Sequence, residues 1–150
     1  MSGKVALATP DRRLCRNVIF IKTIGKDLLG YHKGENVKTV IVPEGVEEIK
    51  ESAFSSSNIS EIQLPSTLKK IGRDAFSSCK NLKCIRIPDG ITVIEDSVFC
   101  MSGIETVNLP ESLKIIGSNA FLHCDDLKDI NLQHFDELQI GEKACKFRLI

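Results

Sequence analysis

Tryptophan is absent from this chain of 150 residues, and aromatic side chains make up only 5% of it. That scarcity argues against an aromatic-lined site for sugars or for stacked nucleobases. Net charge is missing as well, because 20 basic and 20 acidic side chains cancel. No overall field therefore draws the chain to nucleic acid or to an anionic membrane. Long apolar runs are also absent, so no membrane-spanning helix is expected.

What remains is the composition of one folded globular domain, with 42% hydrophobic and 27% charged residues. The N-terminus lacks the apolar core and small-residue cleavage site of a secretory signal. Six cysteines are too few for a disulfide scaffold, and without export we expect them to be reduced. The sequence as written therefore predicts a cytoplasmic protein. It would be extracellular or at the cell surface if the chain is part of a longer, exported protein.

Prolines and phenylalanines recur at a regular interval, which indicates a repeat protein. Four prolines are evenly spaced to within one position, at a period of about 22 residues, and a phenylalanine lies eleven positions after each of them. Aliphatic residues six positions before and six positions after each proline keep the same period. A period of this length is typical of solenoids, in which each repeat forms one coil and stacks on the next. The repeated pairs are Pro43 and Phe54, Pro65 and Phe76, Pro88 and Phe99, and Pro110 and Phe121.

Each repeat unit is expected to hold two short β-strands and a turn. Before the proline, alternating aliphatic residues predict a strand with one buried face. The proline has no N–H donor and therefore ends the strand. A second short strand follows, and we expect the segment around the phenylalanine to reverse the chain as a helical turn with the ring inside.

The repeat pattern divides the chain into three parts. Residues 1–36 do not follow it and are predicted to form an N-terminal cap. Residues 37–145 form a leucine-rich array of about five units, of which the last is degenerate because Gln133 and Cys145 replace the proline and the phenylalanine. Residues 146–150 are predicted to be a C-terminal tail. Caps at both ends would cover the open ends of the solenoid.

The consensus Leu-x-x-Ile-x-Ile-Pro-x-x-Ile-x-x-Ile-x-x-x-x-Phe resembles the BspA-type leucine-rich repeat, as does the motif Ala-Phe-x-x-Cys, whose last four residues are 76–79 and 121–124. The resemblance covers residues 37–145. It implies a curved solenoid that binds other macromolecules. Many members of that family are surface or secreted proteins of bacteria and parasitic protists, involved in adhesion to host proteins.

The strand positions between the buried aliphatic residues are expected to face outward over the concave side of the solenoid. We call this surface the strand face. Our prediction is that the strand face binds a protein, and the alternative is a sheet surface that is merely solvated. Its predicted residues are Thr39, Ile41, Glu61, Gln63, Cys84, Arg86, Thr106, Asn108, Asp129 and Asn131.

Charged residues outside the strand face have a simpler interpretation. The acidic pair at residues 47–48 and the basic pair at residues 69–70 occupy matching positions in successive units, so ion pairs between coils are expected. Residues 1–38 carry 8 basic and 3 acidic side chains, a net charge of +5. We interpret this segment as a solvated cap, since it is too weakly basic to indicate nucleic-acid binding.

Two clusters invite a chemical interpretation, and the repeat pattern weakens both. His123-Cys124-Asp125 suggests a nucleophile, and the spacing of Cys79, Cys84, Cys100 and Cys124 suggests a metal site. However, Cys79 and Cys124 occupy the position that holds serine in other units, which indicates a small buried filler. They would lie two coils apart, about 9–10 Å, too far to share a zinc ion. Cys84 is expected on the strand face and should be the first thiol to react.

A disulfide between Cys100 and either Cys79 or Cys124 is geometrically feasible but is not expected in a reducing compartment. Asn58-Ile59-Ser60 is a glycosylation sequon, which has meaning only in an exported eukaryotic chain.

No Ser-His-acid spacing, glycine-rich phosphate loop or metal-binding pair of side chains appears in the sequence. We therefore predict a non-enzymatic protein-binding module with no cofactor and no metal. Its partner would be a protein, with no nucleic acid and no membrane span. Homodimerisation is a further option, because a short solenoid leaves sheet edges uncovered. The alternative function is that of a secreted or surface adhesin fragment that binds host matrix proteins, and a cysteine-dependent or metal enzyme is the least favoured.

Overall fold

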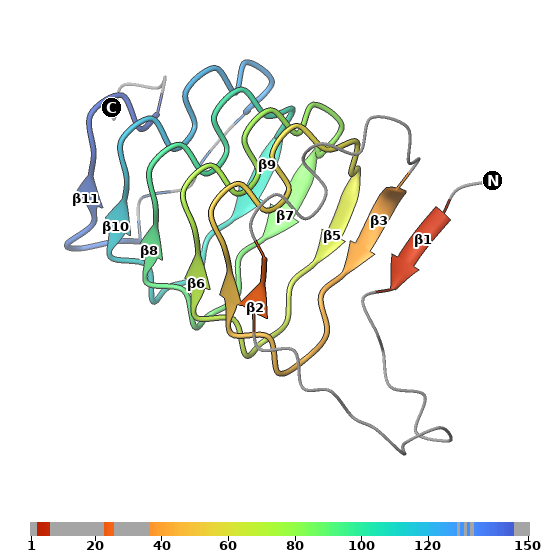
Figure 1. Ribbon diagram of the computed structural model, residues 1–150. Helices are drawn as coiled ribbons and strands as arrows, with labels where there is room; N and C mark the ends of the chain where they lie inside the picture. Colours follow the sequence, from red (N-terminus) through yellow and green to blue (C-terminus); the bar gives the residue numbers. More distant parts are fainter. Residues whose placement is uncertain are drawn as a thin grey trace.

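The computed structural model describes residues 3–6, 23–25, 37–128, 130, 132 and 134–145. The described chain forms a solenoid of stacked coils, with short strands on two faces (Figure 1). The repeat solenoid predicted from the sequence is thereby confirmed. One face carries β1 (Gly3–Ala6), β3 (Val37–Ile41), β5 (Glu61–Gln63), β7 (Cys84–Arg86) and β9 (Thr106–Asn108). The other carries β2 (Thr23–Ile24), β4 (Glu48–Ile49), β6 (Lys70–Ile71), β8 (Val93–Ile94), β10 (Ile115–Ile116) and β11 (Gln139–Ile140).

Neighbouring strands pair in parallel and keep the register of the repeat. In the pair β3–β5, Thr39 lies opposite Glu61 and Ile41 opposite Gln63. In the pair β7–β9, Arg86 lies opposite Asn108. Equivalent residues of successive units therefore stack in columns, as the sequence period predicts.

The strand ladders are interrupted at one place on both faces. On the first face the sheets are β1-β3-β5 and β7-β9, and on the second they are β2-β4-β6 and β8-β10-β11. Both breaks fall between the same two coils, where the unit from Pro65 to Pro88 is one residue longer than the units on either side. We call this break the seam. The turns around the phenylalanines, here called the turn layer, remain bonded across the seam: the Phe76 N–H donates to the Val98 carbonyl at 2.9 Å.

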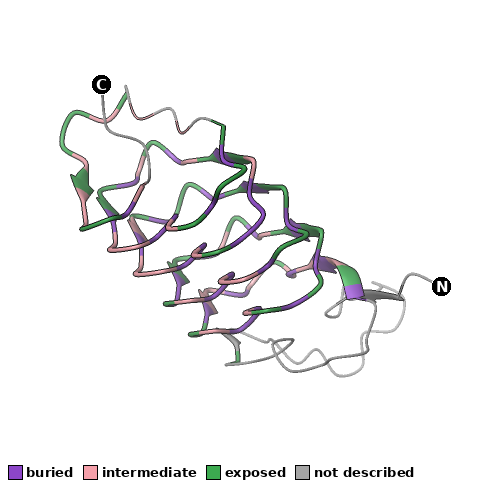
Figure 2. Ribbon diagram, turned by 90° about the horizontal axis from the view of Figure 1, so that it is seen from above, coloured by how far each residue is buried: buried purple, intermediate pink, exposed green. Residues whose placement is uncertain are grey.

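The core is built from aliphatic residues of both strand sets and from one phenylalanine in each unit. The four rings are buried and stack along the solenoid, with centroid separations of 5.3, 5.6 and 5.2 Å and interplanar angles of 4°, 7° and 14°. Figure 2, viewed from above, shows buried residues at matching places in successive coils. Each ring is therefore covered by its neighbours in adjacent coils, and the units stabilise one another.

The prediction of helical turns is wrong, since the described residues contain no helix. The segment around each phenylalanine instead alternates its backbone hydrogen bonds. The N–H groups of Ser52, Phe54 and Ser56 donate to carbonyls of the next coil at 2.8–2.9 Å, and those between them bond within the turn. Ser52 and Ser56 have φ values of 56° and 59°. A right-handed helix cannot contain these left-handed residues.

The left-handed conformation recurs at equivalent positions of the other units. Aspartate, asparagine and histidine adopt it more readily than most residues with a Cβ, and Asp74, Asn119 and His123 are examples. The residues concerned in the other units are Asp74, Ser78, Ser97, Met101, Asn119, His123 and Lys143.

Candidate functional site

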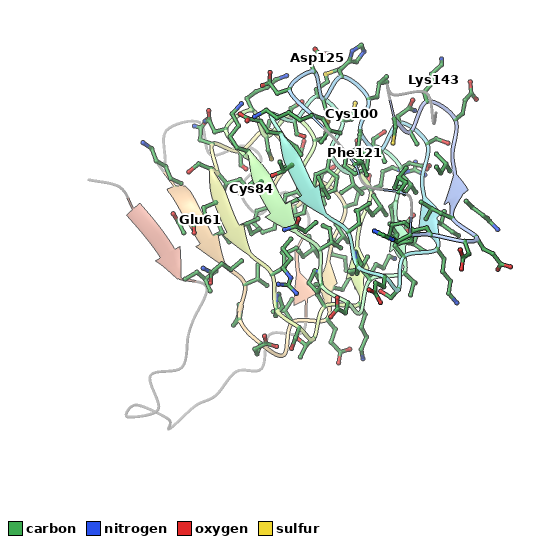
Figure 3. All side chains as sticks on the ribbon, turned by 180° about the vertical axis from the view of Figure 1, so that it is seen from behind. Glu61, Cys84, Cys100, Phe121, Asp125 and Lys143 are labelled. Carbon is green, nitrogen blue, oxygen red and sulfur yellow. The ribbon has the colours of Figure 1, made fainter. Side chains whose placement is uncertain are left out.

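The strand face has the alternating exposure that the sequence predicts. Strands β5, β7 and β9 each hold one buried residue between two exposed ones. Glu61 and Cys84 are seen on neighbouring strands of this face in Figure 3. Thr39 and Ile41 on β3 are half-buried. The exposed members are Glu61, Gln63, Cys84, Arg86, Thr106 and Asn108, whereas Asp129 and Asn131 lie outside the described residues.

Few of these side chains are engaged within the protein. The Thr39 hydroxyl donates to Glu61 Oε2 at 3.4 Å, an exposed contact. The side chains of Gln63, Arg86 and Asn108 make no hydrogen bond or ion pair with the described residues. An amide both donates and accepts, and a guanidinium offers five donors in a planar arrangement. The strand face can therefore form hydrogen bonds with a second molecule without first breaking its own.

A groove of about 480 Å³ lies at the seam, where the strand face meets the turns that follow the repeated prolines, here called the proline turns. We call it the seam groove. Its apolar lining comes from Ile62, Leu64 and Pro88. Gln63 and Arg86 contribute polar atoms from β5 and β7, and Glu44, Ser66 and Asp89 contribute them from three successive proline turns.

The turn side of the seam groove is fixed by hydrogen bonds between coils. Ser66 donates its N–H to Glu44 Oε1 and its hydroxyl to Glu44 Oε2, both at 3.0 Å. These bonds, the backbone one first, lower the pKa of Glu44 below its ordinary value, so the carboxylate is charged at neutral pH. The Thr67 hydroxyl accepts from the Gly45 N–H at 2.9 Å and donates to the Val46 carbonyl at 2.8 Å.

Two of the cysteines fill buried positions, as the repeat pattern predicts. The Cys79 thiol donates to the Phe54 carbonyl at 3.0 Å and lies 3.5 Å from the Ser57 hydroxyl. Cys124 repeats this arrangement two units later, at 2.9 Å from the Phe99 carbonyl. Burial raises the pKa of Cys79 to about 11 and also raises the pKa of Cys124. Such thiols are poor nucleophiles, which argues against a catalytic role for residues 123–125.

Metal binding finds no support in the part of the chain that the structure describes. It holds no group of three histidine, cysteine or carboxylate side chains arranged for a metal ion. The five described cysteines, including Cys100, are free. Cys84 is exposed on the strand face, in the position that the repeat pattern assigned to it.

The ion pairs between coils include those expected from the sequence. Lys69 lies 3.2 Å from Glu47, and Lys70 lies 3.5 Å from Glu48. A further network was missed: Glu105 bridges Lys83 at 3.4 Å and Lys128 at 2.9 Å, and Lys83 also reaches Asp126 at 3.1 Å. Lys83, Glu105 and Lys128 occupy the second position of successive units, so the register could have revealed them. All are at least partly exposed, so solvent screens these pairs and they add little to stability.

The seam groove was also missed, although a signal exists in the sequence. The residue after each proline is Glu44, Ser66, Asp89 and Glu111 in turn. A short serine side chain between longer acidic ones leaves space at the second coil. The interrupted pairing of β5 and β7 has a signal as well, because the unit from Pro65 to Pro88 is one residue longer than the units on either side.

No helix in the described part of the chain is long and apolar enough to cross a membrane.

Comparisons with known proteins agree on the architecture. The family model of the BspA type leucine rich repeat region matches residues 22–146 in six copies. The matched range starts within the segment predicted as a cap, where β2 pairs with β4. No curated protein matches the sequence.

Solved structures of bacterial proteins have similar folds. A leucine rich cell surface protein of Faecalibacterium prausnitzii has a TM-score of 0.58 and 27% identity, over 73% of this chain and 27% of that chain. A leucine-rich repeat protein of Bacteroides ovatus has a TM-score of 0.61 and 21% identity, over 91% and 41%. A leucine-rich repeat protein of Eubacterium ventriosum has a TM-score of 0.54 and 23% identity, over 83% and 40%. The match thus spans between 27% and 41% of the length of these chains.

Repeat solenoids of this type are protein-interaction modules and typically carry no enzymatic activity. Because the family model covers most of the sequence and the solved relatives share the stacked coils, the chain belongs to the BspA-type leucine-rich repeat family.

Proposed function

We propose that the chain is a non-enzymatic module that binds a protein partner on its strand face. The observation that carries the proposal is the row of exposed side chains on β5, β7 and β9 that have no partner within the described protein. Gln63 stands on one sheet, and Arg86 and Asn108 stand on the sheet that follows it across the seam; the opposite side of both sheets is core. The strands fix the backbone that carries these groups, so binding a partner orders side chains but little backbone.

The test compares three immobilised proteins in partner capture from extracts and culture medium of the source organism. They are the wild type, a strand-face variant with Gln63, Arg86 and Asn108 changed to alanine, and a control variant with Asn58, Thr92 and Lys114 changed to alanine. Each variant removes one cationic and two neutral polar side chains, all exposed. Circular dichroism establishes beforehand that all three are folded.

We expect a protein that is retained by the wild type and the control variant and is lost from the strand-face variant. With that protein purified, its Kd should rise at least tenfold for the strand-face variant, about 1.4 kcal/mol. Equal retention by all three proteins would refute the assignment of the strand face. Retention by none would refute the binding function.

A second candidate function is adhesion at a cell surface. It is favoured by the 27% identity to a leucine rich cell surface protein over 73% of this chain. In that case the partner would be a host matrix protein or a mucin. Saturable binding of the wild type to immobilised fibronectin, laminin, collagen or mucin, with loss in the strand-face variant, would support adhesion. Binding to none of these four would contradict it.

A further inference from the structure

Backbone groups at the seam groove lack the partners that they have elsewhere in the array. The Val42 N–H donates to the Gln63 carbonyl, and the Ile87 N–H donates to the Asn108 carbonyl, both at 3.0 Å. The equivalent bond at the seam, from the Leu64 N–H to the Arg86 carbonyl, is not made between these described residues. These two groups face each other across the seam without bonding, so the strand ladder that closes this surface elsewhere is open beside the seam groove.

The apolar surface of the seam groove is suited to an aliphatic chain. Leu64 is half-buried, as is the equivalent Leu109, whereas the equivalent residues Val42 and Ile87 are buried. Together with Ile62 and Pro88, Leu64 forms an apolar surface next to open solvent. Long basic side chains bury their aliphatic carbons on such a surface and keep the charged end in contact with polar groups.

The charges around the seam groove favour a positive charge at the end of such a side chain. Glu44 and Asp89 flank Ser66 on the turn side, against the single guanidinium of Arg86 on the strand side. Glu44 is held in place by Ser66, and the Asp89 carboxylate has no hydrogen bond or ion pair with the described residues. Residues 39–150 carry 12 basic and 17 acidic side chains, so the repeat array itself is acidic, with a net charge of −5 that the +5 of residues 1–38 balances.

We propose that the seam groove receives an extended segment of the partner protein with a lysine or arginine side chain. That side chain lies along Leu64 and Pro88 and places its charge beside Asp89 and Glu44. The proposal rests on the function proposed above and adds the chemistry of the partner.

The test uses a displayed library of random heptapeptides selected on the immobilised wild type. Enriched peptides are then measured by fluorescence polarisation against three variants: Asp89→Asn, Asp89→Lys and Glu111→Gln. Glu111 occupies the same position in the next unit and does not line the seam groove, so it is the matched control.

We expect the enriched peptides to combine a basic residue with apolar neighbours. Their Kd should rise about two- to fivefold for Asp89→Asn, the range of a partly exposed ion pair, and at least tenfold for Asp89→Lys. Glu111→Gln should leave the Kd unchanged within twofold. The affinity should also fall as the salt concentration rises.

Three results would overturn the proposal: no enrichment, enrichment of acidic peptides that depend on Arg86, or basic peptides that bind both Asp89 variants as tightly as the wild type. The last result would mean that basic segments, including the basic N-terminal segment of a second copy, bind at another place on the protein. The experiments distinguish failure of this seam-groove proposal from failure of the proposed function. A partner that is lost from the strand-face variant but binds both Asp89 variants normally would leave the strand face established and the seam groove unused.

Discussion

Cys79 and Cys84 are close in the sequence, yet their thiols lie in opposite environments. Cys79 is buried and donates to the Phe54 carbonyl, while Cys84 is exposed on the strand face. Alkylation requires an accessible thiolate, and burial raises the pKa of Cys79 to about 11. We therefore expect iodoacetamide at pH 8 to modify Cys84 at least tenfold faster than Cys79 or Cys124, as measured by peptide mass spectrometry. Equal rates under native conditions would mean that the repeat register is wrong.

The buried thiol of Cys79 also makes stability depend on alkaline pH. Its pKa is raised from 9.0 to about 11, so the folded state keeps a proton that the unfolded state loses. This contribution is complete below about pH 9 and is lost as the pH rises toward 11. Its upper limit is about 3 kcal/mol.

The variant Cys79→Ser is expected to lack this alkaline loss. Serine occupies the equivalent positions Ser57 and Ser102, so the substitution should cost less than about 1 kcal/mol at pH 7. Urea unfolding of both proteins at pH 7 and pH 10.5 isolates the effect, because the other titrating groups are common to the two. A parallel decline in both proteins would argue that the Cys79 thiol ionises as easily in the folded as in the unfolded state.

At the scale of the element, the turn after each second strand depends on residues with positive φ. Met101 is an example, with a φ of 57° and a side chain that is 45% exposed. A residue with a Cβ pays about 1–2 kcal/mol for this conformation, whereas glycine does not. Met101→Gly should therefore leave the free energy of unfolding unchanged or raise it by up to about 1 kcal/mol. Met101→Val should lower it by about 1 kcal/mol, because a β-branched residue is poorly tolerated there.

A helical turn would give the opposite order for Met101. In a helix, glycine costs about 1 kcal/mol relative to a good helix former, and valine costs less. Urea denaturation of the two variants and the wild type therefore distinguishes the two backbone conformations by the sign of the glycine effect.

The elements differ in how far the sequence predicts them. Strands and core follow from the spacing of proline, phenylalanine and aliphatic residues, because side chains that recur once in every unit stack in the same place. The turns do not follow in this way. Ser52 and Ser56 are compatible with either a helical turn or a left-handed residue, and the choice is made by carbonyls of the next coil, such as those of Arg73 and Ser77.

At the scale of the whole molecule, the seam divides the described array into two blocks of paired strands. The blocks remain joined through the core and the turn layer, including the rings of Phe76 and Phe99 at 5.6 Å. The Leu64 N–H lies at the boundary and lacks the bond that protects the Val42 and Ile87 N–H groups. We expect its hydrogen exchange to be at least tenfold faster than theirs, measured by NMR at pH 7. Equal protection of all three would mean that the strand ladder is continuous.

Of the candidate site, the strand face was predictable from the sequence and the seam groove was not. The exposed residues of β5, β7 and β9 follow from the register, because alternate positions of a strand face opposite sides. The seam groove depends on which coils fail to pair, and that is decided by the fit of complete units. Glu44, Ser66 and Asp89 come from three different units, so no single repeat contains the arrangement.

The stacked phenylalanines also determine how the protein can be observed. With no tryptophan and one tyrosine, the chain has almost none of the intrinsic fluorescence that is normally used to follow folding. Four nearly parallel rings at 5.2–5.6 Å, however, hold their transition dipoles in one chiral array. The phenyl bands of the near-ultraviolet circular dichroism spectrum should consequently be intense for so few aromatic residues. They would report on the stacking of the coils without any added probe.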